Sequence, residues 1–135
     1  MPNMTGAQFV AETIKSYGVD HIFFVPAVLY QVLSEFEKIG GMPVMAHSEK
    51  SAAYMADAYA RISHGASLCM AQSVGAFNLA AGLQDAYLAC SPVIAITGRE
   101  SQIHQHRHAY QEVDHINPFS AVTKYSALVS TPQQL

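Results

Sequence analysis

The sequence predicts an α/β protein with three layers, in which helices cover both faces of a mostly parallel sheet. The first observation is the order of the pattern: short apolar runs of strand length alternate with longer segments of helical periodicity. The second is composition, because half of the 135 residues are hydrophobic and only 13% are charged, which suits one domain with a real core. Strands and helices that alternate in this way form right-handed βαβ units.

A capped helix followed by a strand opens the pattern. Residues 5–8 (TGAQ) have the spacing of a capping box, and the helix that they begin is expected to stop at Gly18. The apolar run 21–25 (HIFFV) predicts a strand that ends at Pro26. Apolar side chains at helical spacing then predict a second helix; they are Leu29, Val32, Leu33, Phe36 and Ile39.

The middle of the chain continues with a strand and an alanine-rich helix. The run 42–46 (MPVMA) predicts a strand, which we expect to be buried, and a helix follows over 49–61 and ends near His64. Its small side chains allow close packing against a flat surface or another helix. They are Ala52, Ala53, Ala56, Ala58 and Ala60.

Two more strands and one helix complete the regular part. Residues 67–71 predict a strand and residues 76–90 a helix. Gly82 lies inside that helix at a cost of about 1 kcal/mol relative to alanine, so we expect a close packing contact there. The run 92–97 (PVIAIT) is the clearest candidate for a buried strand. We also expect the two small-residue helices to contribute to a subunit interface.

The last third of the chain is less regular. Residues 99–118 carry four of the seven histidines, and residues 121–129 return to an apolar, β-rich pattern. Residues 130–134 (STPQQ) have a capping residue and a proline, as at the start of a helix. We therefore expect residues 1–135 to be one domain that lacks its last helix and strand, as part of a longer protein; the alternative is a frayed natural terminus.

Composition and motifs exclude several classes. A net charge of −3 without a basic stripe argues against nucleic acid, and no apolar run reaches membrane-spanning length. Without a signal peptide we expect a cytoplasmic protein, with Cys69 and Cys90 as reduced core thiols. The dinucleotide fingerprint, the P-loop and the G-x-S-x-G elbow are absent from the sequence.

Alternating histidines form a second kind of signal. His104, His106 and His108 would share a face in an extended segment, as a metal site or a substrate pocket could require. Arg107 among them and the missing carboxylate or thiolate partner argue against a metal. A solvated loop and a substrate-pocket role remain open.

Glu49 stands where the predicted strand 42–46 passes into its helix, and this place has two interpretations. An acid in the first turn of a helix interacts favourably with the helix dipole. An acid at the carboxyl end of a parallel strand also lies where open α/β sheets bind ligands.

Several segments, in order along the chain, resemble one enzyme family. The run 49–61, EKSAAYMADAYAR, resembles the E-x-G-A-A-x-M-A-D-G-Y-A-R segment of thiamine diphosphate enzymes of the acetolactate synthase and pyruvate oxidase group. Further matches are GAFNL, GLQDAY, PVIAITG, AYQEVD and VTK, which extend the resemblance to Lys124. The resemblance implies the N-terminal, pyrimidine-binding domain of a decarboxylase or carboligase that acts on 2-keto acids.

The resemblance also implies roles for residues. Glu49 falls on the family's catalytic glutamate, which hydrogen-bonds the aminopyrimidine ring of thiamine diphosphate and assists removal of a proton from its thiazolium carbon. Pro26, Gly75 and Asn78, together with Glu49, are the expected cofactor-binding residues. His104, His106 and Gln111 are the candidate residues of the substrate pocket.

The family's Mg²⁺ and diphosphate bind to a G-D-G…N motif in a separate domain, and this sequence has no G-D-G. The expected partners are thus a diphosphate-binding domain, in the longer chain or in a second subunit, and further copies in a homo-oligomer. We expect no metal ligands in this chain and no activity from it alone. A non-catalytic interaction domain of the same fold is the alternative.

Departures from the family pattern motivate that alternative. Phe24, Ala27, Ser51, Ala58 and Ser73 stand where the family usually has glycine, and Val74 replaces a proline. Because glycine permits close backbone approach and positive φ, we expect a reshaped pocket.

Overall fold

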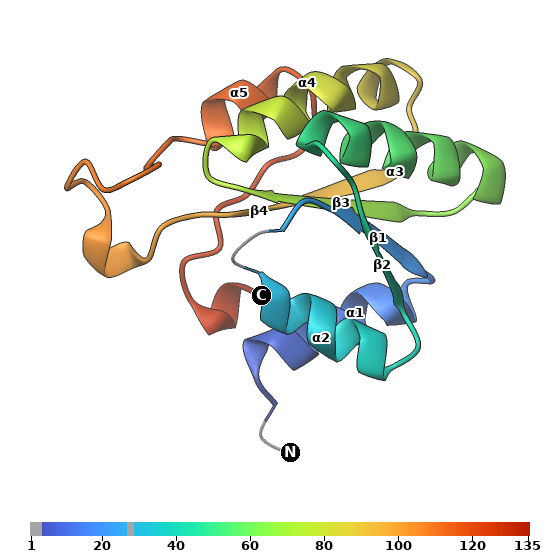
Figure 1. Cartoon of the computed structure of the whole chain (residues 1–135), viewed down its shortest axis with the longest axis horizontal. Coiled ribbons are helices and arrows are strands. Elements are labelled where there is room, and N and C mark those ends of the chain that lie inside the picture. Colours follow the sequence, from blue (N-terminus) through green and yellow to red (C-terminus); the bar gives the residue numbers. More distant parts are fainter. Residues whose placement is uncertain (1–3, 27–28) are drawn as a thin grey trace.

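The computed structural model describes residues 4–26 and 29–135 and contains a sheet of four parallel strands. The strands are β1 (His21–Phe24), β2 (Met42–Met45), β3 (Ser67–Gln72) and β4 (Val93–Gly98). Their order in the sheet is β2-β1-β3-β4, so the chain crosses over between the two sides of β1. The predicted parallel sheet and the alternation of strands and helices are confirmed (Figure 1).

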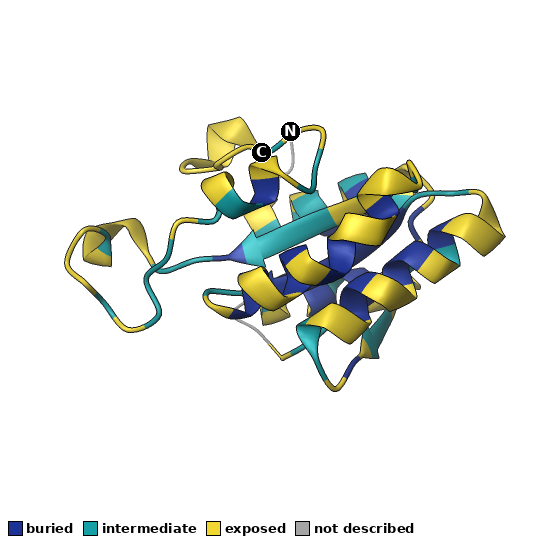
Figure 2. Ribbon diagram, turned by 90° about the horizontal axis from the view of Figure 1, so that it is seen from above, coloured by how far each residue is buried: buried dark blue, intermediate teal, exposed yellow. Residues whose placement is uncertain are grey.

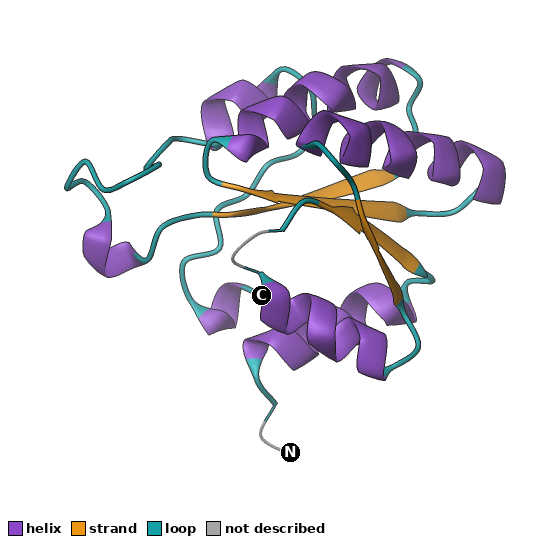
Figure 3. Ribbon diagram, viewed as in Figure 1, coloured by secondary structure: helices purple, strands orange, loops and turns teal. Residues whose placement is uncertain are grey.

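Helices lie on both faces of this sheet, as predicted (Figure 3). One face carries α1 (Gly6–Ser16) and α2 (Tyr30–Lys38). The other carries α3 (Glu49–Ser63), α4 (Gly75–Leu88) and the short α5 (Ile116–Ser120). Of the two single-turn 3₁₀ helices, η1 (Gln102–His104) lies away from these layers, and η2 (Pro132–Gln134) lies on the side of the sheet that carries α1 and α2.

Each face of the sheet has its own hydrophobic cluster. Phe36, Ile22 and Leu68 are fully buried between the sheet and α1 and α2. Ala53, Leu79 and Phe119 belong to the cluster under α3 and α4. Figure 2 shows the buried stripe along the inner side of each of these two helices, with exposed residues on the outer side. Two separate clusters are what a sheet covered on both faces requires.

The helix ends follow from local sequence. Thr5 closes the predicted capping box with Gln8, and each residue's side chain accepts a backbone N–H of the other. The helix start predicted over residues 130–134 also has a capping box, between Thr131 and Gln134, although it begins only the 3₁₀ turn η2. Residues 121–129, despite their β-rich pattern, contain no strand.

Two strands are less buried than their sequences predict. The runs 42–46 and 92–97 were expected to be buried, but β2 and β4 are the two edge strands. Met42 and Met45 are exposed. Pro43 fits an edge strand because proline has no backbone N–H to donate, and an edge strand has a neighbour on one side only. Ile94 on β4 is 41% exposed. Only β3, in the interior of the sheet, is buried along nearly its whole length.

The two thiols also differ from each other. Cys69 on β3 is buried, as predicted, and this burial raises the pKa of its thiol to about 12. Cys90 is exposed and has a left-handed backbone conformation (φ 55°) just after α4, so the prediction that it is a core thiol is wrong.

Within the described ranges 4–26 and 29–135, no helix is long and apolar enough to cross a membrane.

Small side chains bring α3 and α4 together. A Cβ built on Gly82 would lie 2.7 Å from the Cβ of Ala53 and 2.8 Å from the carbonyl oxygen of Lys50, so the predicted close contact is confirmed. Ala52, Ala56 and Ala60 are buried as well. Most of the small residues of α3 and α4 are therefore buried within this domain.

Asp57 and Arg61, within the run 49–61, form an ion pair. Both guanidinium nitrogens Nε and Nη2 of Arg61 donate to the carboxylate of the buried Asp57, at 2.8 Å each. The Arg61 side chain thereby lowers the pKa of Asp57. This bidentate pair joins successive turns of α3 and satisfies the carboxylate of the buried Asp57.

Candidate functional site

The candidate site lies at the carboxyl edge of the sheet, where each strand passes into the next segment. Pro26 follows β1, Glu49 begins α3 after β2, and Gly75 begins α4 after β3. Because all four strands are parallel, these three connections meet at the same edge. The structure thus places the predicted cofactor-binding residues on the side of the sheet where ligands bind in open α/β folds.

Glu49 is the first residue of α3 and is half-buried. The cap of this helix is Ser48, whose hydroxyl accepts the backbone N–H of Ser51 at 3.2 Å. The Glu49 carboxylate instead extends towards α4, where Asn78 Nδ2 donates to its Oε2 at 3.2 Å. Ser48, and not Glu49, caps the helix. The specific role of the Glu49 side chain is therefore its hydrogen bond to Asn78, which joins α3 to α4.

Gly75 makes room for this carboxylate. A Cβ built on Gly75 would lie 2.5 Å from Oε1 of Glu49, well inside van der Waals contact. Gly75 is buried, and its φ does not need glycine, so the requirement here is space. The structure therefore brings Glu49, Gly75 and Asn78 together, with Oε1 next to Gly75 and Oε2 bonded to Asn78.

Gly75→Ala is expected to move the Glu49 carboxylate while leaving the fold intact, because the end of a glutamate side chain can rotate away. If the native-length protein has the enzyme activity that the sequence resemblance implies, we expect its turnover to fall about tenfold, with a free energy of unfolding within about 1 kcal/mol of the parent. Steady-state kinetics and urea unfolding measure the two quantities. Ala76→Gly, one residue further along, is the control for a small change at the start of α4. Unchanged turnover in Gly75→Ala would show that the space beside Glu49 has no function.

Pro26 is exposed and lies in a bend at the end of β1, where the preceding residue, Val25, donates its N–H to the carbonyl of Met70. The structure places Pro26 at the same edge as Glu49. Ala27, one of the departures from the family pattern, lies outside the described residues.

His115, which was not among the predicted site residues, supports the turn before α4. Ser73 has a left-handed backbone conformation (φ 46°), and its N–H donates to the carbonyl of Gly98 at 2.8 Å. Its own carbonyl accepts Nε2 of His115 at 3.0 Å, and Nδ1 of the same ring is 3.0 Å from the hydroxyl of Thr97. Forty-two residues separate Ser73 and His115 in sequence, and no motif or spacing links them.

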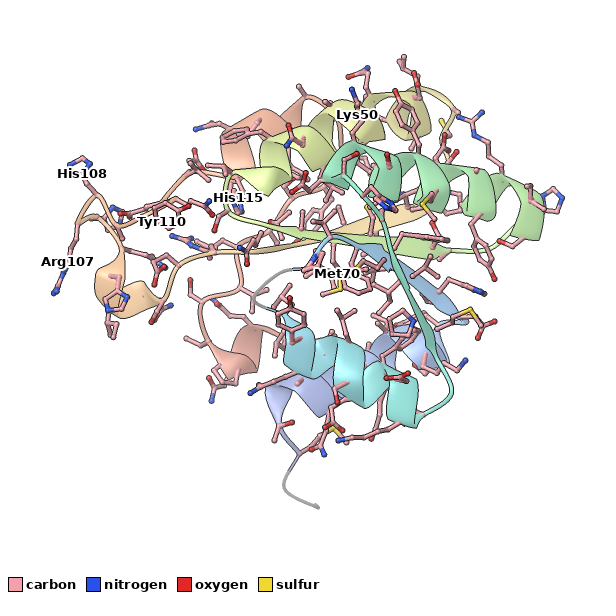
Figure 4. All side chains as sticks on the ribbon, viewed as in Figure 1. Lys50, Met70, Arg107, His108, Tyr110 and His115 are labelled. Carbon is pink, nitrogen blue, oxygen red and sulfur yellow. The ribbon has the colours of Figure 1, made fainter. Side chains whose placement is uncertain are left out.

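His115 is held in one neutral form. Burial lowers its pKa, with a smaller opposite effect from the hydrogen bond to Ser73. A carbonyl oxygen can only accept, so Nε2 carries the proton and Nδ1 accepts the hydrogen of the Thr97 hydroxyl. Figure 4 shows His115 close to the body of the molecule, in contrast to His108 at the outer end of the loop.

The candidate substrate-pocket residues lie in a different place. Residues 99–112 form a loop that projects from the body, seen in orange in Figure 1. Nδ1 of His104 lies 2.8 Å from Oε1 of Glu100, and this hydrogen bond lowers the pKa of that carboxyl. The side-chain amide of Gln111 donates to the hydroxyl of Tyr110 at 3.1 Å. His106 is exposed.

The alternating histidines do not share a face. His104 belongs to the 3₁₀ turn η1, and His106 and His108 both have left-handed backbones. Glu112 stabilises this bent loop by accepting the backbone N–H groups of His106 and Ala109, and these bonds lower its pKa. Among residues 4–26 and 29–135, no three metal-ligating side chains gather into a cluster. The structure does not bring His104, His106 or Gln111 to Glu49.

A separate apolar cavity of about 660 Å³ lies along the outer edge of β4. Ile94 and Thr97 of the strand line one side, and Phe119, Val122 and Tyr125 line the other. His115 also lines it. Glu49, Gly75 and Asn78 are not among its lining residues, so this cavity and the carboxylate site are distinct.

The chain is similar to proteins of one enzyme family along nearly its whole length. Residues 4–117 match the family model described as the N-terminal TPP binding domain of thiamine pyrophosphate enzymes. The chain is 35% identical over 138 residues to the acetolactate synthase of Arthrospira platensis, covering 98% of this chain and 24% of that protein. It is 37% identical over 134 residues to the acetolactate synthase isozyme 2 large subunit of Escherichia coli K12, with the same two coverages.

A solved structure shows the same fold. The thiamine diphosphate-dependent 4-hydroxybenzoylformate decarboxylase of Rhodococcus jostii RHA1 superposes with a TM-score of 0.87 at 19% identity, over 97% of this chain and 26% of that one. The chain spans about a quarter of the length of the curated relatives that it matches.

Proposed function

Because this chain belongs to the thiamine pyrophosphate enzymes, whose N-terminal TPP-binding domain it matches, we propose that residues 1–135 form a domain that binds the aminopyrimidine ring of thiamine diphosphate. The whole protein would be a decarboxylase or carboligase of 2-keto acids, similar to acetolactate synthase. The observation that carries the proposal is the Glu49 carboxylate, held between Gly75 and Asn78 at the carboxyl edge of the sheet.

The residues at this edge fit such a ring. Glu49 is half-buried and supplies a carboxyl group that can share a proton with a ring nitrogen. The donated hydrogen bond from Asn78 fixes one carboxylate oxygen and leaves the other for a ligand. Gly75 leaves space that any side chain would fill. Pro26, at the same edge, is proposed to line the ring's other side.

Thiamine diphosphate, when bound, supplies a carbon nucleophile for the keto group and a ring that accepts the electron pair left when carbon dioxide departs. In our proposal Glu49 is the catalytic residue of this chain, because it holds and moves the proton at the aminopyrimidine ring. Asn78 orients the carboxyl group, and Gly75 permits its approach. His104, His106 and Gln111 are proposed for the substrate side, where the loop 99–112 would have to fold towards the site.

Other parts of the assembly are also proposals. Mg²⁺ and the diphosphate would bind to a diphosphate-binding domain, in a longer chain or a second subunit. This is supported by relatives about four times as long as this chain. The outer faces of α3 and α4, with Tyr54, Met55 and Phe77 exposed, would contact another copy in a homo-oligomer. The free thiols of Cys69 and Cys90 are consistent with a cytoplasmic location.

The experiment is an activity assay with two proteins. The native-length protein is expected to convert at least one 2-keto acid when thiamine diphosphate and Mg²⁺ are both present. Residues 1–135 by themselves are expected to show no such activity, because the site that they offer contacts only the pyrimidine end of the cofactor. Thiamine diphosphate-dependent turnover by residues 1–135 alone would contradict the second expectation, and inactivity of the native-length protein on a broad panel would contradict the first.

A non-catalytic interaction domain of the same fold is the second candidate. Ser73 favours it, because a serine with φ 46° occupies a turn where the family usually has glycine. Calorimetry of the native-length protein with thiamine diphosphate and Mg²⁺ separates the two. Tight binding supports the enzyme, and its absence supports the interaction domain.

A further inference from the structure

The turn between β3 and α4 combines backbone strain with an external support. Ser73 has φ 46°, in the left-handed region that disfavours residues with a Cβ. Its carbonyl accepts two hydrogen bonds, from the N–H of Ala76 at 3.1 Å and from Nε2 of His115 at 3.0 Å. A strained residue persists when the surrounding structure holds it, and here the contacts come from two other elements.

His115 is well suited to be that support. Both ring nitrogens are used: Nδ1 accepts from the hydroxyl of Thr97 near the end of β4, and Nε2–H donates to Ser73. The ring is half-buried, and burial favours its neutral form. The Ser73 carbonyl can only accept, so Nε2 carries the proton; the hydroxyl of Thr97 then donates to Nδ1, and its place near the end of β4 orients the ring.

The turn leads directly to the carboxylate site. Gly75 is two residues after Ser73, and Asn78 lies in the first turn of α4. A rotation of the Ser73 backbone would change the distance from Gly75 and Asn78 to Glu49. The hydrogen bond at 3.2 Å and the tight approach of Gly75 both tolerate little displacement.

We propose that His115 is a positioning residue, which holds Ser73 in its left-handed conformation and so keeps Gly75 and Asn78 against the carboxylate of Glu49. The effect on the turn is independent of any ligand. Only its consequence for catalysis rests on the proposed function.

The test is a rescue experiment in the native-length protein. His115→Ala is expected to increase amide hydrogen exchange in residues 73–78 at least tenfold, because Ser73 leaves its strained conformation part of the time. Glycine adopts positive φ without strain, so His115→Ala with Ser73→Gly is expected to return exchange to within about threefold of the parent. His108→Ala is the matched control, since His108 is exposed at the outer end of the loop. It should change nothing in this segment.

The outcomes decide between positioning and simple packing. If His115 only fills space, Ser73→Gly will not rescue it, and equal exchange in the single and double variants overturns the proposal. Unchanged exchange in His115→Ala overturns it too. Should His115→Ala fail to fold, Thr97→Val replaces it, with a smaller increase in exchange that Ser73→Gly must again suppress.

Kinetics separate this proposal from the proposed function. If the parent turns over a 2-keto acid, His115→Ala should lower kcat at least tenfold with little change in KM, and Ser73→Gly should restore it. An inactive parent with the expected exchange pattern would contradict the proposed function and support the role of His115. An active parent without the expected exchange pattern would support the proposed function and contradict the role of His115.

Discussion

Glu49→Gln in the native-length protein is expected to lower turnover of a 2-keto acid by roughly 10²–10⁴-fold, the range of assistance that a positioned acid or base supplies. Glutamine keeps the shape and can still hydrogen-bond, but it cannot share a proton as a carboxylic acid does. Exchange of the cofactor's thiazolium proton, followed by NMR after quenching, should slow by a similar factor. The hydrogen bond from Asn78 lies at the side-chain oxygen, which glutamine retains, so the fold is expected to be unchanged.

The alternative for Glu49 is a simple helix-start acid. Loss of a charge in the first turn costs only about 0.3–1 kcal/mol of stability and no activity. Glu37→Gln is the matched control, because Glu37 is an exposed glutamate near the end of α2. A Glu49→Gln variant with the parent's rate and slightly lower stability would remove Glu49 from the catalytic role, and with it the centre of the proposed function.

Gly82→Ala is expected to lower the free energy of unfolding by about 2 kcal/mol. Helix propensity alone predicts the opposite sign, a gain of about 1 kcal/mol. The added Cβ would approach the Cβ of Ala53 at 2.7 Å and the Lys50 carbonyl at 2.8 Å. A backbone carbonyl cannot rotate away as a long side chain can, so α3 and α4 must separate, and overpacking of this kind typically costs about 1–3 kcal/mol.

Urea unfolding followed by circular dichroism gives the measurement, with a lower midpoint and an unchanged m-value expected. Ala81→Gly is the control, since Ala81 is exposed on the same helix and its change tests propensity alone. Stabilisation by Gly82→Ala would mean that the contact between the two helices is looser than the structure indicates.

The local sequence by itself was enough to predict the four strands and the helices α1 to α4 in their order, although not η1 and α5. Three kinds of local signal predicted these strands and helices: capping residues such as Thr5, apolar residues at helical spacing, and short apolar runs. Each depends on only a few neighbouring residues, so it can be recognised in the sequence without knowledge of the fold. The junction at Glu49 was predictable for the same reason, because an apolar run of strand length followed by an alanine-rich helical segment defines it. The close packing at Gly82 was also predictable, because glycine destabilises a helix interior and is favoured there only where a neighbour needs the space.

The tertiary structure alone decided which strands lie at the edges of the sheet. The apolar runs of β2 and β4 resemble that of β3, yet only β3 is buried along nearly its whole length, because strand order depends on how crossovers pack and not on local composition. The support of Ser73 by His115 was equally hidden. Its partners are 42 residues apart, and hydrogen bonds between distant segments depend on the packing of all the elements between them, which no local pattern encodes.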